Sequence, residues 1–249
     1  MFKCVFAMAL IISTLSAQAE DKMFKGESEA SIVLVDGNSK SQTISAKSKN
    51  VLTLTDLDLV TIFGSYTDTK ATNQTSPNKD FEQTGKSWTA GIRYDRVFFK
   101  DELTGFVQHQ SEADPFNGVF IQRDSTDLGA KYTIIKNDNL TWFAELGYRY
   151  TSTYAIIDTA VVKGDFARVY TEAGYKMNAS VFGKLWAEYL SSFDTKKNPN
   201  RWNAEASLSV SMTEMLSLKT AYLINHTDDV VSPLKADKST FTTAIVANY

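Results

Sequence analysis

The stretch Trp142–Tyr150 reads WFAELGYRY, and its side chains alternate between two kinds. One set is Trp142, Ala144, Leu146, Tyr148 and Tyr150, and the other is Phe143, Glu145, Gly147 and Arg149. Successive side chains of a β-strand leave opposite faces of the backbone, so this alternation predicts a strand. One face of that strand is apolar with an aromatic ring at each end, and the other carries charges.

The same two-faced pattern recurs along the chain, with charges in the middle of strands as well as at their ends. Clear cases are Asp165–Met177, Val181–Leu190 and Arg201–Met212. Twelve segments can be counted, near residues 27–36, 40–49, 51–66, 87–98, 103–112, 120–134, 140–152, 165–177, 180–192, 201–212, 216–226 and 239–249. The second and third are the least regular, because residues 41–49 are weakly patterned and residues 59–63 are apolar on both faces.

The connections between the segments alternate in length. Short turns such as FFKDE, KNDN, KMNAS and MTEM are interleaved with long polar loops near residues 68–86, 112–118, 153–164, 194–200 and 227–238. All four prolines lie in the long loops, which fits strands whose amides are all needed for pairing. An antiparallel sheet with short turns at one end and long loops at the other is therefore predicted.

Alternating strands occur both in soluble β-sandwiches and in transmembrane barrels. Three features favour the barrel. Each clear strand has about ten residues or more, which is long enough for a tilted strand to cross a bilayer. Aromatic residues gather at the ends of the apolar faces, as in the girdles of membrane barrels. The C-terminus FTTAIVANY alternates up to Tyr249 and resembles the C-terminal signal of bacterial outer-membrane proteins. We therefore predict an all-β, twelve-stranded antiparallel transmembrane barrel, with a soluble periplasmic β-sandwich binding protein as an alternative.

The composition and the N-terminus limit where the protein can work. Its 249 residues have a net charge of −3, so no basic surface for nucleic acid is indicated. Residues 1–19 have a charged start, a short apolar run and Ala17-Gln18-Ala19, which predicts a cleaved signal peptide, with an uncleaved anchor as the alternative. The single cysteine, Cys4, lies in this segment. Residues 20–249 are then expected to form the barrel, in the outer membrane of a Gram-negative bacterium.

Several stretches together resemble one family, the YdiY-like salt-induced outer-membrane proteins. They are GESEASIVLVDGNSK (26–40) with its Gly37-Asn38 turn, DPFNGVFIQRDSTDLGAKY (114–132), AELGYRY (144–150) and SMTEMLSLKTAYLINHTDD (211–229). Pro115 and Ala130-Lys131 depart from the family pattern. The resemblance covers essentially the whole mature chain. It implies an outer-membrane barrel and leaves the function open, because none of these stretches is a catalytic motif.

Strand parity assigns side chains to the lipid or to the lumen. The inward charges are expected to be Glu29, Asp58, Asp95, Asp127, Glu145, Glu172, Glu188 and Glu205 with Arg93, Arg123, Lys131, Arg149, Arg168, Lys176, Lys184 and Lys219. The aromatic girdle is expected to include Trp142, Tyr150, Tyr175, Tyr189, Trp202 and Tyr249. Leu146→Arg should then be costly and Gly147→Ser on the lumen face nearly neutral.

The balance of inward charges leaves two interpretations open. Arg168, Glu172, Lys184 and Glu188 could form one network that supports a narrow or closed lumen. A wet channel for small solutes would instead solvate each charge separately, and an excess of one sign would give ion selectivity. The protein is thus expected to be structural or a narrow passive pore.

An enzyme is the third possibility. His109-Gln110-Ser111 has the H-x-S spacing of outer-membrane phospholipase A, which suggests a lipid hydrolase. Its two side chains would lie about 7 Å apart on one strand face, and no third residue to orient His109 is evident. We expect no enzyme activity, no cofactor and no metal. The expected partners are outer-membrane lipid, lipopolysaccharide and the barrel-assembly machinery, which would read the C-terminal strand.

Overall fold

The protein folds as a closed barrel of twelve antiparallel strands, which confirms the predicted fold class. A computed structural model describes residues 23–36, 40–72, 81–99, 102–156, 161–196, 198–228 and 236–249. The strands are β1 (Phe24–Val35), β2 (Ser41–Thr55), β3 (Asp58–Thr72), β4 (Phe81–Phe99), β5 (Leu103–Ala113), β6 (Phe120–Lys136), β7 (Leu140–Ala155), β8 (Val161–Lys176), β9 (Val181–Ser192), β10 (Arg201–Ser211), β11 (Leu216–Thr227) and β12 (Asp237–Asn248). Among the described residues, no helix is long and apolar enough to cross a membrane.

Each strand pairs with its sequence neighbour, and β1 pairs with β12 to close the barrel. The closing seam is short, with four register pairs from Glu27↔Asn248 to Ala30↔Ile245. Reciprocal backbone hydrogen bonds between Gly26 and Tyr249 extend it. All other neighbouring strands share ten or more register pairs. The edge of β1 from Ser31 to Val35 therefore pairs with β2 and has no register partner on β12.

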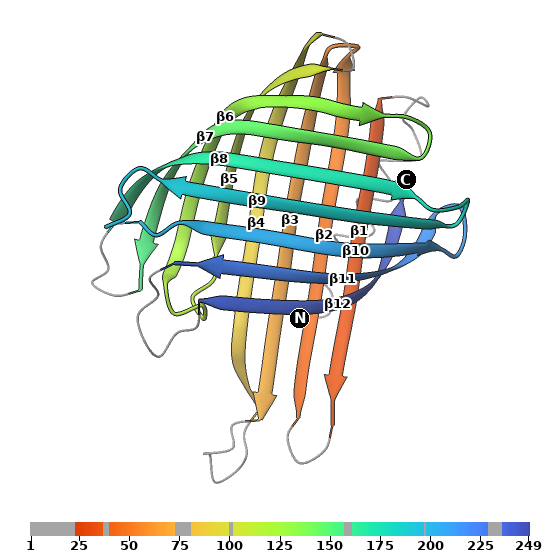
Figure 1. The fold of residues 1–249 in the computed structure, drawn as a ribbon. Helices are drawn as coiled ribbons and strands as arrows, with labels where there is room; N and C mark the ends of the chain where they lie inside the picture. The colour runs from red at the N-terminus through yellow and green to blue at the C-terminus, as the bar shows by residue number, and fades with distance from the viewer. Residues whose placement is uncertain are drawn as a thin grey trace.

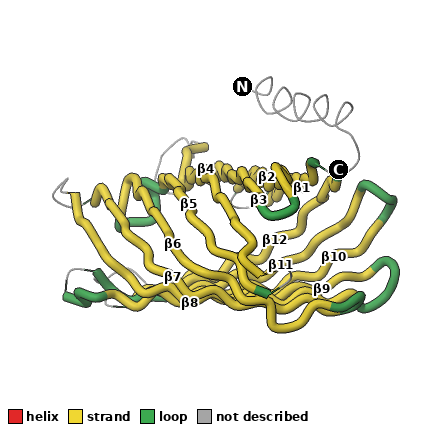
Figure 2. Tube along the Cα trace, turned by 90° about the horizontal axis from the view of Figure 1, so that it is seen from above, coloured by secondary structure: helices red, strands yellow, loops and turns green. Residues whose placement is uncertain are grey.

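The barrel is flattened into two walls that cross each other. In Figure 1, β1–β4 run behind β6–β12 at a steep angle to them, and the view from above in Figure 2 separates the two groups as opposite walls. The β1–β2 and β3–β4 hairpins extend beyond the other strands. We call the end of the barrel where β1 begins, β12 ends and the short turns lie the turn end, and the opposite end, with the longer loops, the loop end.

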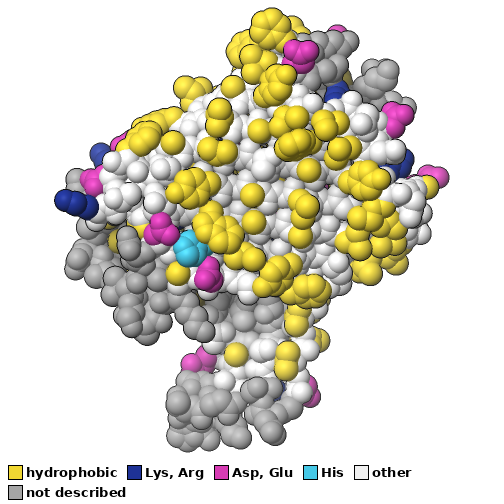
Figure 3. Space-filling model, in the orientation of Figure 1, with side chains coloured by type: hydrophobic (Ala, Val, Ile, Leu, Met, Phe, Trp, Pro, Cys, Tyr) yellow, Lys and Arg dark blue, Asp and Glu magenta, His cyan; other side chains and the backbone are white. Residues whose placement is uncertain are grey.

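The alternation in the sequence becomes an apolar outside and a polar inside. Leu146, Leu185 and Ile245 are more than half exposed on the outer surface. Their neighbours in sequence, such as Glu145 and Arg149, are buried in the interior. Figure 3 shows hydrophobic side chains spread over the wall formed by β6–β12, with charged side chains mainly near the edges of the view. This distribution inverts that of a soluble protein and suits lipid around the barrel and water-tolerant groups within it.

Two predicted strand borders are wrong. The second and third segments were expected at 40–49 and 51–66, but β2 continues to Thr55 and the turn lies at Asp56-Leu57. Residues 49–51 lie inside β2, since Lys49, Asn50 and Val51 pair with both β1 and β3. The loop predicted at 68–86 is also shorter, because β3 runs to Thr72 and β4 begins at Phe81. The predicted signal peptide and the Gly37-Asn38 turn lie outside the described residues.

Candidate functional site

The interior of the barrel contains a connected group of buried ion pairs, which we call the central cluster. Its members are Arg93 and Asp95 on β4, Asp127 on β6, Glu145 and Arg149 on β7, Arg168 on β8 and Glu188 on β9. All seven residues had been predicted to face the lumen, and the register of the strands turns them to the same side. The cluster therefore joins the inner surfaces of β4, β6, β7, β8 and β9.

Two carboxylates link the three arginines of the central cluster. Glu145 accepts from Arg93 at 2.8 Å and from Arg168 at 2.7 Å. Glu188 accepts from Arg168 at 2.7 Å and from Arg149 at 3.1 Å. Asp95 lies 2.8 Å from Arg93 at one end of the cluster, and Asp127 lies 2.6 Å from Arg149 and 3.6 Å from Arg168. Each arginine therefore contacts at least two carboxylates.

The central cluster is packed as well as paired. Arg149, Arg168, Asp127 and Glu145 are each less than 7% exposed. The ring of Phe106, itself 3% exposed, lies beneath the guanidinium of Arg93 at 4.0 Å from ring centroid to Cζ. Because burying these charges is costly unless every one is paired, the charge-assisted hydrogen bonds hold the cluster in one arrangement. Its ion pairs cross the lumen from β4 to β7 and β8.

A polar cavity of about 630 Å³ lies beside the central cluster. It borders on β1–β9, and its lining includes Lys47 and Lys49 on β2, Gln108 and Gln110 on β5, and Lys131 on β6. Within the described part of the chain these three lysines make no ion pair, although Lys131 lies 5.7 Å from the centre of the Phe143 ring. The lining thus combines amides, hydroxyls and these lysines with the carboxylates Glu27, Glu29 and Glu172 and with apolar side chains such as Phe63 and Trp186. Arg93, Asp95, Glu145 and Arg168 of the cluster border the cavity.

The other predicted lumen charges are not part of the central cluster. Glu172 accepts a hydrogen bond from Tyr170 at 2.6 Å, and Lys219 forms a close ion pair with Glu29. Glu205 is buried, and Lys184 makes no ion pair among the residues described. The expected network of Arg168, Glu172, Lys184 and Glu188 is therefore only partly correct, because Glu172 and Lys184 do not belong to it. Arg168 and Glu188 do meet, but the other partners come from β6 and β7.

Asp58 does not face the lumen, contrary to the prediction. It accepts hydrogen bonds from Tyr94 at 2.5 Å and from Arg96 at 2.7 Å. Both donors have the opposite parity to Arg93 and Asp95 on β4, so the group lies on the outer surface at the turn end. Residues 59–63 are apolar on both faces, so the alternation there did not determine which face of β3 is inward.

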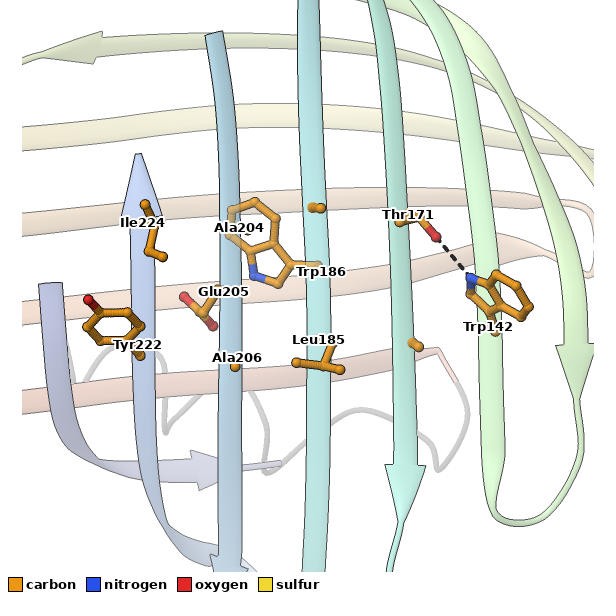
Figure 4. Close-up of a pocket in the computed structure, with 11 residues that line it drawn as sticks. Trp142, Thr171, Leu185, Trp186, Ala204, Glu205, Ala206, Tyr222 and Ile224 are labelled. Atoms are coloured by element: carbon orange, nitrogen blue, oxygen red, sulfur yellow. Dashed lines mark hydrogen bonds between the residues drawn. The ribbon is translucent and has the colours of Figure 1, made fainter. Parts of the chain in front are cut away.

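The predicted girdle residues lie on the outer surface at two levels. Trp142, Tyr175 and Tyr249 are near the turn end, and Tyr150, Tyr189 and Trp202 are near the loop end. Trp142 donates its indole N–H to Thr171 Oγ1 at 2.9 Å (Figure 4). Beside it, a shallow apolar hollow of about 300 Å³ lies between Trp142, Leu185 and Tyr222 and is floored largely by alanines (Figure 4).

His109 and Ser111 do not form a catalytic pair in this structure. Both side chains lie on the outer face of β5, since Gln108 and Gln110 line the cavity. His109 Nδ1 is 2.9 Å from Thr126 Oγ1, whereas Ser111 donates to Asp124 at 2.6 Å. Each residue is therefore engaged by a different partner on β6. Within the described residues, no group of three or more His, Cys, Asp or Glu side chains could hold a metal ion.

Sequence reasoning missed several interior charges. Lys47 and Lys49 belong to the weakly patterned second segment, and no parity had been assigned there. Arg201 is the first residue of β10 and shares the parity of Asn203 and Glu205, so the alternation of that strand could have found it. Its side chain lies 4.7 Å from the ring centre of Phe166, which is 1% exposed.

Comparison with solved structures supports the fold. The COG4313 outer membrane channel from Pseudomonas putida F1 is similar with a TM-score of 0.53 at 10% identity, over 93% of this chain and 97% of that one. The NanC porin is similar with a TM-score of 0.52 at 8% identity, over 91% of this chain and 99% of that one. At these identities the likeness concerns the fold alone.

Comparison of the sequence gives the family. No curated protein matches the chain significantly. The profile of a family described as "Protein of unknown function, DUF481" matches residues 28–249, which include all twelve strands except the first residues of β1. The chain therefore belongs to the DUF481 family, whose function is unknown.

Proposed function

We propose that the protein is a narrow passive pore for small polar solutes in the outer membrane of a Gram-negative bacterium. One observation carries the proposal: a cavity of about 630 Å³, with charged, amide and hydroxyl side chains in its lining, lies inside a closed barrel beside the central cluster. Amides, hydroxyls, lysines and carboxylates are part of the lining of the cavity, so it could hold water and small polar solutes. The ion pairs narrow the passage and keep its width fixed.

The position of the protein in the envelope belongs to the same proposal. The apolar outer surface between two levels of aromatic residues supports contact with membrane lipid, and with lipopolysaccharide on the outer leaflet. A signal peptide at residues 1–19 would direct export. The C-terminal strand would be read by the barrel-assembly machinery, which is supported by Tyr249, stacked on Phe24 at 6.0 Å between ring centroids. We further propose that, within its family, the chain is a YdiY-like salt-induced protein and has no enzyme activity.

Single-channel recording in planar bilayers tests the pore. The purified barrel should give small, discrete current steps. Gln108→Trp places a large side chain in the cavity and should reduce the step size, whereas Val107→Trp on the outer face should leave it unchanged, because Val107 is 43% exposed on the lipid side. Absence of any current from correctly folded protein would contradict the pore and leave a structural role. If Gln108→Trp and Val107→Trp reduced the step size equally, the solute would not pass through this cavity.

A further inference from the structure

The loop end of the lumen holds two arginines that are packed against aromatic rings. Arg123 on β6 lies with its Cζ 4.0 Å from the ring centre of Phe120, and Arg201 on β10 lies 4.7 Å from that of Phe166. Both phenylalanines are buried. A ring under a guanidinium fixes its plane and leaves its N–H edge free to bind. The rings of Phe120 and Phe166 therefore hold the two guanidinium groups in place.

These arginines lack the carboxylates that the other inward arginines have. Arg123 has one partner, Glu112 at 3.1 Å, and its Nε is buried without a hydrogen-bond acceptor. Arg201 makes no ion pair or hydrogen bond with any described residue, and its Nε is also buried. Arg93, Arg149 and Arg168 each contact at least two carboxylates. A guanidinium keeps its charge in proteins, so burying one without a counterion is costly.

The charges near Arg201 raise the free-energy cost of burying it without a carboxylate partner. Burial is the main cost for the charge of Arg201, and the nearby charges of Arg123 and Arg149 add repulsion to it. The charge of Arg149 is already matched by Asp127 and Glu188 in the central cluster. Among the described residues, Glu112 is the one carboxylate that forms an ion pair with either arginine, so positive charge is in excess around them.

We infer that Arg201 and Arg123 form a binding site for the anionic group of a small solute, a carboxylate or a phosphate, at the loop end of the lumen. The planar fork of a guanidinium matches the two oxygens of such a group, and Arg201 has that fork unoccupied. Because the site faces inward, it is suited to a dissolved anion and not to the head group of a lipid outside the barrel. The inference rests on the proposed pore, and it adds that the pore selects anionic solutes.

Stability measurements in the presence and absence of anion test the site without requiring current. The barrel in lipid vesicles is unfolded with urea in chloride, and then at equal ionic strength with inorganic phosphate or with acetate. Phosphate or acetate should raise the unfolding midpoint in a saturable way. Arg201→Gln should abolish this rise, whereas Lys238→Gln, which removes an exposed charge at the same end, should retain it.

A purely structural role for Arg201 predicts a different result. If the side chain mainly supported the barrel, Arg201→Gln would lower the midpoint in chloride. As an unpaired and repelled cation it should leave that midpoint unchanged or raise it. No effect of either anion on the unmodified protein, or a lower midpoint for Arg201→Gln in chloride, would overturn the site.

Current measurements separate this inference from the pore itself. In a gradient of potassium chloride, the reversal potential of the unmodified protein should indicate anion preference, and Arg201→Gln should shift it toward cation preference. If the protein conducts, but Arg201→Gln does not shift the reversal potential and anions do not raise the unfolding midpoint, the anion site is contradicted and the pore is still supported. Stabilisation by anions without any current would support the site and contradict the pore.

Discussion

The central cluster should respond to substitution as one unit, and a double-mutant cycle on Arg168 and Glu188 measures this directly. Arg168 contacts Glu145 and Glu188, both at 2.7 Å. If Arg168 becomes Gln, Glu145 keeps Arg93 and Glu188 keeps Arg149, so neither carboxylate is left entirely unpaired. Breaking a buried pair costs about 3–5 kcal/mol, and the remaining partners place Arg168→Gln near the lower end, at about 3 kcal/mol.

Glu188→Gln should cost a similar amount, because Arg168 keeps Glu145 and Arg149 keeps Asp127. The double substitution removes a matched pair, so its cost should fall short of the sum of the single costs by about 1–2 kcal/mol. The free energy of unfolding is measured by urea titration in lipid vesicles, followed by tryptophan fluorescence. Lys40→Gln is the control, because its pair with Asp36 is exposed, and it should leave the midpoint unchanged.

The reasoning would be refuted by single substitutions that each cost less than about 0.5 kcal/mol and add up in the double variant, since sites without interaction are additive. That result would mean that water solvates each charge separately. The lumen would then be an open aqueous channel at the level of the central cluster, and the cluster would not restrict its width.

Three further outcomes are expected. Leu146→Arg puts a cation on the lipid face at a site that is 66% exposed there, and should cost about 2–4 kcal/mol in the same urea titration. Gly147→Ser should also destabilise, by about 1–3 kcal/mol, because a Cβ at this position would lie 2.9 Å from the backbone oxygen of Leu128; a neutral result would show that β6 and β7 can move apart. The folded barrel should migrate differently on a detergent gel before and after boiling, since all its strands are paired in a closed sheet; a single band position under both conditions would argue against the closed barrel.

The faces of the strands could be predicted from the sequence because a period of two is a local property. Glu145, Arg149 and Arg168 were assigned inward from their own strands alone, and they lie in the interior. The exception, Asp58, precedes residues 59–63, which are apolar on both faces, so the alternation there does not distinguish the inner face from the outer one. The near-neutral effect that the strand alone suggests for Gly147→Ser is revised for another reason, because the close approach of β6 to β7 depends on the partner strand.

The partners of the interior charges could not be predicted in the same way. Glu172 lies opposite Trp186 in the register of β8 and β9, so its neighbour there is aromatic, while Arg168 reaches Glu188 diagonally. The contact of Arg168 with Glu145 depends on the register of β7 against β8 and on the depth of both residues in the barrel. Such contacts between strands are a property of the closed sheet, and the alternation within one segment does not contain them.

The short seam between β1 and β12 makes the barrel mechanically uneven. Separating these strands breaks four register pairs and the link between Gly26 and Tyr249, whereas separating any other neighbours breaks at least ten pairs. Thermal fluctuations that open a sheet start where the fewest hydrogen bonds resist, so breathing of the wall concentrates on this line. The first and last strands, which close the barrel, are thus the ones expected to part first, and any sideways opening of the wall would occur at this one line of the circumference.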